Sequence, residues 1–457
     1  MDGILVQRLM RRFAAGLLLG GTALLVYNKR IGLTDPNGIA VGQLLLRPEL
    51  WFGVAVITAL VAMPRSCFRL VPAPKNARRV LRTGPVVAFV SAVLGSLLSW
   101  WRFGIGMNLF GVQICVRMVL CALLAILTYN LAGRSRQFAH RLSALLVWAP
   151  AVNVLVGLGF LASPAIIAAI FGPQMILEAQ GVLDYGSRYQ GLTSNPDMVA
   201  TSSCVAMALL LPGFLRDISR ARPFAIIKGI YMLGLASVIA WSGVRASVVI
   251  LLLVCAATLG LSFRFTKRGL MRFGYIACAL AIIMILGLLI IWRIGAMDII
   301  LERFHSGNGR LFLWIFYGRT LLHNPLGLGF GYESIVHTDQ IIPGQRLPPH
   351  NTFLEMAMYG GWIGLFIHAL VLWWTLRWIG RVREKHGRSS PLPVRLQSLI
   401  LGWLANIASL FFAGLIFVDP YYTIITALLL AELGRAAAAG SVHQPAKVES
   451  LVVPHPT

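Results

Sequence analysis

Charged side chains are scarce in this sequence. They account for 12% of the 457 residues, whereas 58% are hydrophobic and the mean hydropathy is +0.77. Such a composition excludes a soluble fold with a polar surface and makes lipid the solvent for most of the chain. Bilayer hydrocarbon is about 30 Å thick, so each membrane-spanning helix needs about 20 apolar residues. At that length the chain has room for about ten to twelve spans.

Metal-ligand and redox motifs are also missing. The six cysteines stand inside or beside apolar stretches, and none forms a Cys-x-x-Cys pair or a Cys/His ligand set. We interpret them as helix-packing residues. No Asp-x-Asp motif occurs, and no His, Asp and Glu cluster has metal-ligand spacing. This disfavours a nucleotide-sugar held by a metal as substrate, and we expect no cofactor.

Basic residues outnumber acidic ones by 40 to 16, which gives a formal net charge of +24. A nucleic-acid-binding protein gathers its basic residues on one solvated face beside stacking aromatics. Here they fall in short clusters between apolar runs, so no nucleic-acid partner is expected. The pattern is typical of cytoplasmic loops under the positive-inside rule, with anionic membrane lipids as their partners.

Twelve apolar runs are predicted to cross the membrane as helices, because every backbone donor and acceptor in hydrocarbon needs an internal partner. They lie near residues 13–28, 49–64, 84–101, 111–131, 142–162, 199–214, 225–241, 246–262, 273–292, 353–376, 396–416 and 420–436. We therefore predict an all-α, polytopic integral membrane protein with about 12 transmembrane helices. Arg8, Arg11 and Arg12 before the first run resemble a signal peptide, but no small-residue cleavage site follows, which favours an uncleaved span.

Five basic clusters set the predicted orientation. They begin at Arg65, Arg134, Arg216, Arg264 and Arg377. Each lies an even number of predicted spans from the N-terminus, so the clusters and both termini are expected on the cytoplasmic side.

The alternate loops carry most of the acidic residues and are expected to face outward. Two of them are long, about 163–198 and about 293–352, the second between spans 9 and 10. Loops of that length in a compact membrane protein are usually functional or disordered, and their Gly, Pro, Trp and Tyr content argues for order. We predict one transmembrane domain over 1–436 and a disordered cytoplasmic tail over 437–457.

Unusual residues are densest between 306 and 364. Arg310 follows a Gly-Asn-Gly turn and begins an aromatic run containing Trp314, which suits an amphipathic helix on the membrane surface. Further on, Gly329 and Gly331 belong to a glycine-rich segment whose backbone is bare of side chains, as a loop that approaches a ligand needs.

The pair His350-Asn351 stands where the second long loop re-enters the membrane. Imidazole titrates near neutrality, so His350 is the candidate general base that takes a proton from a sugar hydroxyl. The alternative is an interfacial hydrogen-bonding residue. For His305, His323 and His337 we favour a structural role over a functional one. For Glu355 we favour burial against a polar neighbour over a catalytic role.

Two further arginines lie at the same predicted outer level. Arg188 is in the first long loop, and Arg245 is in a tight turn on the side where basic residues are normally depleted. A guanidinium near the interface costs free energy unless it has an anionic partner. Its planar donor fork suits phosphate oxygens two at a time, so Arg188, Arg245 and Arg310 together would suit a pyrophosphate. For each arginine, contact with lipid phosphate remains the alternative.

Five segments in order resemble the O-antigen ligase and O-antigen polymerase family of bacterial envelope glycosyltransferases. They are RYQGLTSNPD, SGVRAS, GRLFLW, NPLGLGFG and PPHNTFLEMAMYGGWIG, which together cover about residues 185–365. The resemblance implies a GT-C-like, multi-pass enzyme of the bacterial inner membrane. It also implies a metal-independent transfer, on the periplasmic side, of a glycan from an undecaprenyl-pyrophosphate donor to a lipid A core or a growing glycan. Polysaccharide chain-length or export proteins are further partners that it suggests.

The resemblance also assigns roles to residues. It puts the arginines that hold the lipid pyrophosphate at Arg245 and Arg310 and the histidine that activates the acceptor at His350. Arg188 matches an upstream Arg-x-x-Gly element with a supporting or pyrophosphate-contacting role. The sequence has Ser-Gly-Val-Arg where a Ser-Arg pair is more usual. Asn351, Trp314, Gly329 and Gly331 are the remaining candidate substrate-binding residues.

Two other function classes stay open at this point. A flippase or polysaccharide transporter would also have basic inner loops, but it should concentrate polar residues at mid-membrane depth, whereas here they lie in outer loops. A non-catalytic scaffold of an envelope assembly complex is the third reading. The sequence does not distinguish a ligase from a polymerase, nor does it give the sugar, the linkage or the oligomeric state.

Overall fold

The structure of the 457-residue chain is a computed structural model. It describes residues 2–24, 48–62, 74–104, 109–163, 177–178, 188–189, 196–262, 309–336, 349, 351–386, 392–413 and 419–442.

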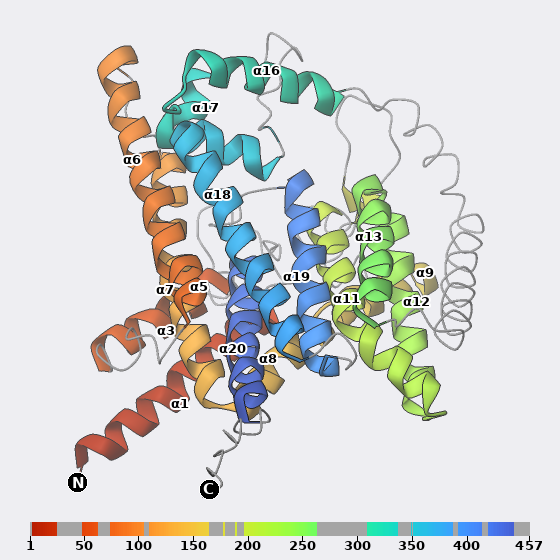
Figure 1. The fold of residues 1–457 in the computed structure, drawn as a ribbon. Helices are drawn as coiled ribbons and strands as arrows, with labels where there is room; N and C mark the ends of the chain where they lie inside the picture. The colour runs from red at the N-terminus through yellow and green to blue at the C-terminus, as the bar shows by residue number, and fades with distance from the viewer. Residues whose placement is uncertain are drawn as a thin grey trace, which may run out of the picture.

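Helices make up nearly all of the described chain (Figure 1). In chain order they are α1 (Asp2–Ala23), α3 (Pro48–Ala62), α5 (Lys75–Arg78), the π-helical turn η2 (Arg79–Thr83), α6 (Gly84–Phe103), α7 (Leu109–Arg134), α8 (Arg136–Trp148), α9 (Ala151–Ala162), α11 (Pro196–Ser219), α12 (Phe224–Ser242), α13 (Arg245–Ser262), α16 (Gly309–His323), the 3-10 turn η4 (Gly329–Gly331), α17 (Tyr332–Ile335), α18 (Thr352–Lys385), α19 (Val394–Ala413) and α20 (Pro420–Val442).

One short pair of strands is the exception among the described elements and leaves the predicted all-α class intact. Strand β1 (Leu177–Glu178) runs antiparallel to β2 (Arg188–Tyr189), with Leu177 opposite Tyr189 and Glu178 opposite Arg188. Both strands belong to the first long predicted loop, so that loop contains ordered backbone pairing. A pair of two-residue strands leaves no hydropathy period long enough to be recognised in a sequence.

Seven helical segments in the described residues are long and apolar enough to cross a membrane. They are Lys75–Phe103, Gly111–Arg134, Arg136–Ala162, Pro196–Ser219, Phe224–Ser242, Thr352–Lys385 and Val394–Phe411. Helices also occur at the predicted spans that begin at 13, 49, 246 and 420. The predicted span 273–292 lies outside the described residues. The structure thus supports a multi-pass membrane protein, while the predicted number of about 12 spans stays a prediction.

Two boundaries differ from the predicted ones. The predicted span 142–162 is part of a broken segment, because α8 begins at Arg136 and a turn at Ala149 and Pro150 separates it from α9. Proline lacks the N–H that an uninterrupted helix needs. The last helix continues to Val442, beyond the predicted boundary at 436, and the rest of the tail lies outside the described residues.

Five helix pairs make the main contacts: α11 with α19, α6 with α18, α1 with α3, α11 with α12, and α7 with α20. Helix α11 is therefore covered on most sides. Gly402 lets α19 and α11 approach closely, since a Cβ there would lie 2.6 Å from a methyl group of Leu209 in α11. The core therefore contains the predicted apolar runs packed helix against helix.

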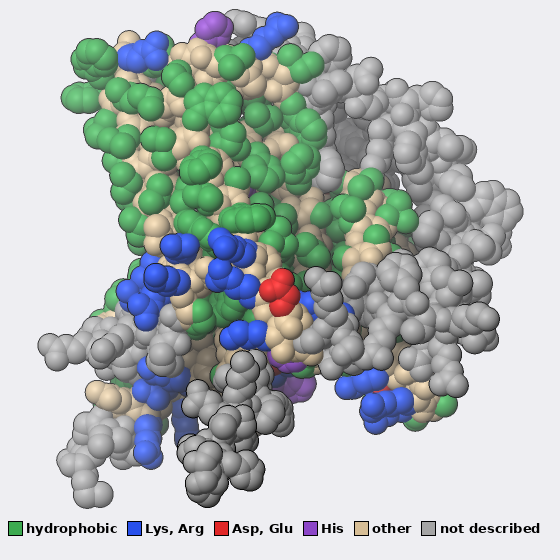
Figure 2. Space-filling model, in the orientation of Figure 1, with side chains coloured by type: hydrophobic (Ala, Val, Ile, Leu, Met, Phe, Trp, Pro, Cys, Tyr) green, Lys and Arg blue, Asp and Glu red, His purple; other side chains and the backbone are tan. Residues whose placement is uncertain are grey.

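The two ends of the bundle differ in the residues they carry. In Figure 1, α16 lies across the upper end of the bundle, and the first turn of α1 and the last turn of α20 lie at the lower end. Figure 2 shows hydrophobic side chains over the upper part of one face and Lys and Arg side chains gathered below them. Most of the basic side chains visible in this view thus lie below the hydrophobic surface and a few lie at its upper edge, which is the asymmetry that the positive-inside pattern predicts.

Candidate functional site

Arg245 is the first residue of α13. Helix α12 ends at Ser242, and Gly243 follows in the left-handed region with a φ of 65°. This positive φ turns the chain back within two residues, which glycine permits at little cost. The turn is tied to α11, because the Cys204 thiol donates to the carbonyl oxygen of Ser247 at 3.7 Å. Arg245 therefore stands on the first turn of a helix, where free N–H groups and the helix dipole favour an anion.

Arg188 lies in β2, and its neighbour fixes that strand against the bundle. The Tyr189 side chain is fully buried, stacks on the Trp241 ring with centroids 4.6 Å apart, and donates its hydroxyl to the carbonyl oxygen of Asn153. Trp241 lies on the last turn of α12, directly before the turn that leads to Arg245. The structure thus brings the strand of Arg188 to the helix end that precedes Arg245.

Helix α16 confirms the aromatic helix predicted after the Gly-Asn-Gly turn, with Arg310 as its second residue. One turn later, the Trp314 indole N–H donates to the carbonyl oxygen of Pro349 at 2.9 Å. The Trp314 ring also meets the edge of Phe411 of α19, with centroids 5.9 Å apart. Trp314 therefore fixes the residue directly before His350, which itself lies outside the described residues. Its predicted contact with substrate stays a prediction.

Asn351 is the N-cap of α18 and is 4% exposed. Its side-chain oxygen accepts the backbone N–H groups of Phe353 at 2.9 Å and Leu354 at 3.2 Å. An N-cap side chain satisfies N–H groups that the helix leaves unpaired. The structure explains Asn351 by this cap, so its predicted substrate contact has a structural alternative. Both neighbours of His350 in the chain are thus held by hydrogen bonds.

The glycine-rich loop packs directly on α6. A Cβ on Gly329, where φ is 69°, would lie 2.1 Å from the backbone nitrogen of Ser96. The Ser96 hydroxyl accepts the N–H of Phe330 at 2.8 Å, and the Ser99 hydroxyl donates to the carbonyl oxygen of Leu328 at 2.7 Å. Gly329 and Gly331 are both buried. Close approach to α6 accounts for Gly329 without a ligand, and the predicted substrate contact of Gly329 and Gly331 stays a prediction.

The same loop holds a kink in α18 that the sequence analysis missed. Gly360 and Gly361 have non-helical dihedrals, with a φ of 61° at Gly361. The N–H of Leu328 bonds to the carbonyl oxygen of Met358 at 2.7 Å, and the N–H of Trp362 bonds to that of Pro325 at 2.9 Å. These bonds replace helical ones and orient the first two turns of α18. The Gly-Gly pair within an apolar run was the available signal.

The described candidate residues lie toward one end of the bundle. Helix α16 crosses the upper end in Figure 1 and ends near α6, where Arg102 Nη1 donates to Asn324 Oδ1 at 3.3 Å. Its Arg310 end therefore faces away from α6. Below it, α19 contacts both α13 and α18. The first turns of α13 and α18 thus lie toward the end of the bundle that α16 crosses.

An apolar hollow of about 330 Å³ adjoins the glycine-rich loop. It is lined by Ser91, Leu94, Leu97, Trp101, Leu326 and Ile363. Trp101 is 80% exposed, so the hollow opens on the lipid-facing side of α6. Among the described residues, no group of three or more His, Cys, Asp or Glu side chains stands close enough to hold a metal ion.

These observations define a multi-pass helical membrane protein with arginine-bearing helix starts at one end of its bundle. A family model described as O-antigen ligase matches residues 230–369. The match confirms the resemblance to the O-antigen ligase and polymerase family over just under a third of the chain. It includes Arg245, Arg310 and the kink of α18, and it leaves Arg188 outside. No curated protein matches the chain.

Proposed function

We propose that the protein is a glycosyltransferase of the bacterial inner membrane that uses an undecaprenyl-pyrophosphate-linked glycan as donor. The acceptor is a sugar hydroxyl, either of a lipid A core or of another lipid-linked glycan, and transfer takes place on the periplasmic face. Both chain termini are cytoplasmic in this proposal. The family match supports a ligase or polymerase in general, and the donor, the acceptor and the sidedness are our inference.

In the proposed reaction, His350 accepts the proton of the acceptor hydroxyl. The oxygen attacks the anomeric carbon, the bond to the pyrophosphate oxygen breaks, and undecaprenyl pyrophosphate leaves with the electron pair. Arg245 and Arg310 stabilise the negative charge that grows on the leaving group. Arg188 supports this contact. If the attack is a single displacement, the anomeric configuration is inverted.

One observation carries the proposal. Two candidate arginines each occupy the first turn of a helix at the same end of the bundle, and the neighbours of His350 are fixed at that end by Trp314 and by the cap of α18. Helix starts favour phosphate through their unpaired N–H groups. The apolar hollow beside the glycine-rich loop is open to lipid and suits a stretch of the isoprenoid chain.

The test is replacement of His350 by alanine in cells that make a lipid-linked glycan. We expect the glycan product to disappear while the lipid-linked donor still reaches the outer face and accumulates there. His323→Ala is the matched control, because His323 is exposed at the far end of α16 and should leave product formation unchanged. Donor stranded on the inner face in His350→Ala cells would instead indicate a flippase.

A further inference from the structure

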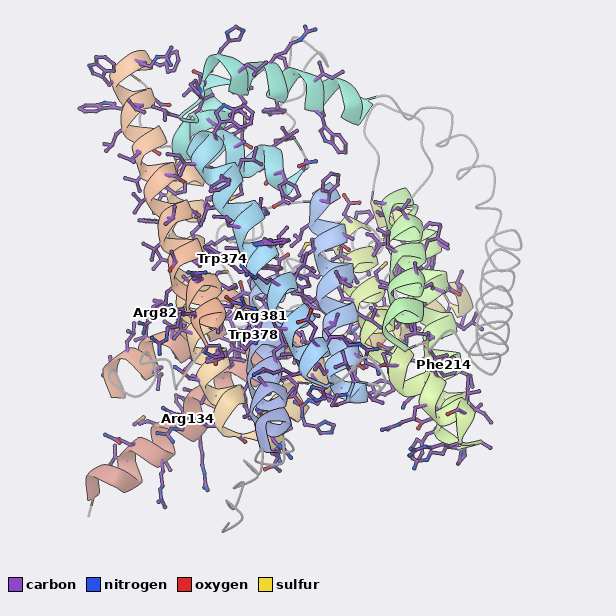
Figure 3. The ribbon with its side chains drawn as sticks, in the orientation of Figure 1. Arg82, Arg134, Phe214, Trp374, Trp378 and Arg381 are labelled. Atoms are coloured by element: carbon purple, nitrogen blue, oxygen red, sulfur yellow. The ribbon has the colours of Figure 1, made fainter. Side chains whose placement is uncertain are left out.

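A cluster of exposed arginines lies on one face of the bundle, away from α16 and directly below the hydrophobic surface. We call it the basic seam and define it as Arg79 and Arg82 of η2 with Arg377 and Arg381 of α18. All four side chains are exposed. Figure 3 shows Arg82 and Arg381 at a similar level of the bundle, near Trp374 and Trp378. Figure 2 shows basic side chains gathered directly below the hydrophobic surface.

Local structure explains why the two halves of the seam meet. The π-helical turn at Arg79–Thr83 buries Val80 and Leu81 and turns the neighbouring arginines outward. Directly after it, a Cβ on Gly84 would lie 2.4 Å from a methyl group of Val371, so α6 and α18 touch at this level. The Arg79 guanidinium lies 5.6 Å above the centre of the Trp374 ring. This cation–π contact joins η2 to α18.

Acidic residues are scarce around the seam. The sequence has no Asp or Glu between Glu49 and Glu178, so α5, η2 and α6 contribute only positive charge. On the α18 side, Glu384 is the nearest acidic residue along the helix. Within the described part of the chain, neither Arg377 nor Arg381 has a carboxylate oxygen within 4 Å. Guanidinium groups gathered in this way favour an anion from outside the chain.

The surroundings of the seam indicate which anion. One turn before Arg377 on the same helix, Trp373 is 56% exposed, and on α6 Val86 and Val90 are 59% and 49% exposed. A ligand in the seam would therefore touch cations with one end and lipid-facing apolar side chains with the other. Phosphate joined to acyl chains matches this arrangement, whereas a soluble anion would leave the apolar wall unused.

We propose that the basic seam binds the phosphate of an anionic glycerophospholipid, with the acyl chains lying along the exposed faces of α6 and α18. The site is independent of the proposed transfer reaction and lies away from α16. Trp374 holds Arg79 toward α18, so that guanidinium groups from both helices contact one headgroup.

The test uses the full chain purified in neutral detergent, with added phosphatidylglycerol as the probe. Bound lipid is counted by native mass spectrometry, and the melting temperature is measured in parallel. A basic residue near an anionic lipid surface contributes about fivefold in affinity, or about 1 kcal/mol. We expect Arg377→Gln/Arg381→Gln to bind phosphatidylglycerol about 25-fold more weakly and to lose the lipid-dependent rise in melting temperature.

The control is Arg136→Gln/Arg220→Gln, which removes the same charge from two exposed arginines outside the seam. It should bind phosphatidylglycerol as the unchanged protein does. Equal loss in both double variants would mean that only total charge matters and would overturn the proposal. Equal protection by phosphatidylcholine, or by inorganic phosphate at the same concentration, would also overturn it.

Discussion

Replacement of Trp314 by phenylalanine tests whether Trp314 positions His350 in addition to stabilising the fold. Phenylalanine keeps an aromatic ring against Phe411 but removes the N–H that donates to the carbonyl oxygen of Pro349 at 2.9 Å. A lost hydrogen bond costs about 1 kcal/mol, which should lower the melting temperature by about 2 °C. The backbone before His350 then gains freedom. A shift of about 1 Å in a reacting group can cost about 100-fold in rate.

We therefore expect Trp314→Phe to lower kcat for glycan transfer by about 10-fold to 100-fold. The assay is transfer in proteoliposomes with a lipid-linked donor, alongside a thermal melt of the same preparation. Trp100→Phe is the matched control, because Trp100 is 63% exposed on α6 and does not line the apolar hollow, and its kcat should be unchanged. Unchanged kcat in Trp314→Phe would refute the positioning role, as would a loss of activity that merely follows a loss of folded protein.

Three further predictions concern the support of the site and one buried carboxyl. Gly329→Ala should lower stability by about 2 to 4 kcal/mol, since φ is 69° and the new Cβ meets Ser96. Gly318→Ala, with nothing within 4 Å, should be tolerated. Asn351→Ala should cost about 0.5 to 2 kcal/mol through loss of the cap of α18, and Asn351→Asp should restore it. Asp419→Asn should raise the melting temperature more at pH 8 than at pH 5. Thermal melts of purified variants test all three.

The sign of the Asp419 prediction follows from its environment. Burial raises the pKa of this carboxyl to about 6, although the N–H groups of Tyr421 and Tyr422 act in the opposite direction. The native state then holds the proton more tightly than the unfolded chain, so stability falls as pH rises through about 6. Asparagine removes that loss and still caps α20.

Three outcomes would contradict these predictions. An equal gain at both pH values for Asp419→Asn would contradict the ionisation argument. Full stability of Gly329→Ala would mean that α6 and the glycine-rich loop are not in close contact. A stable but inactive Asn351→Ala would point to the substrate contact predicted from the sequence in place of the cap.

The sequence was sufficient to place most helices, because a membrane span needs a long apolar run whatever its neighbours are. The predicted span 84–101 corresponds to α6, and the predicted span 353–376 lies within α18. The kink at Gly360 and Gly361 was not predicted, because it depends on a loop about 30 residues away in the chain. The π-helical turn before Gly84 likewise reflects packing against α18.

The candidate site was predictable in part. A turn followed by an apolar run indicates a helix start, so the placement of Arg245 and Arg310 follows from local patterns. Asn351 before an apolar run was also an N-cap signal, and it was interpreted as a substrate contact. Gly329 was interpreted as a ligand-approach residue because its partner, Ser96, is more than 200 residues away. Such long-range contacts leave no local pattern.

The most direct test of the central claim is glycan transfer by the purified chain in liposomes, with an undecaprenyl-pyrophosphate-linked donor and a panel of lipid A core and lipid-linked acceptors. The account predicts a glycan product and free undecaprenyl pyrophosphate, both lost in Arg245→Gln and Arg310→Gln variants that melt as the unchanged protein does. Failure to form product with every acceptor, or full activity in both arginine variants, would contradict it.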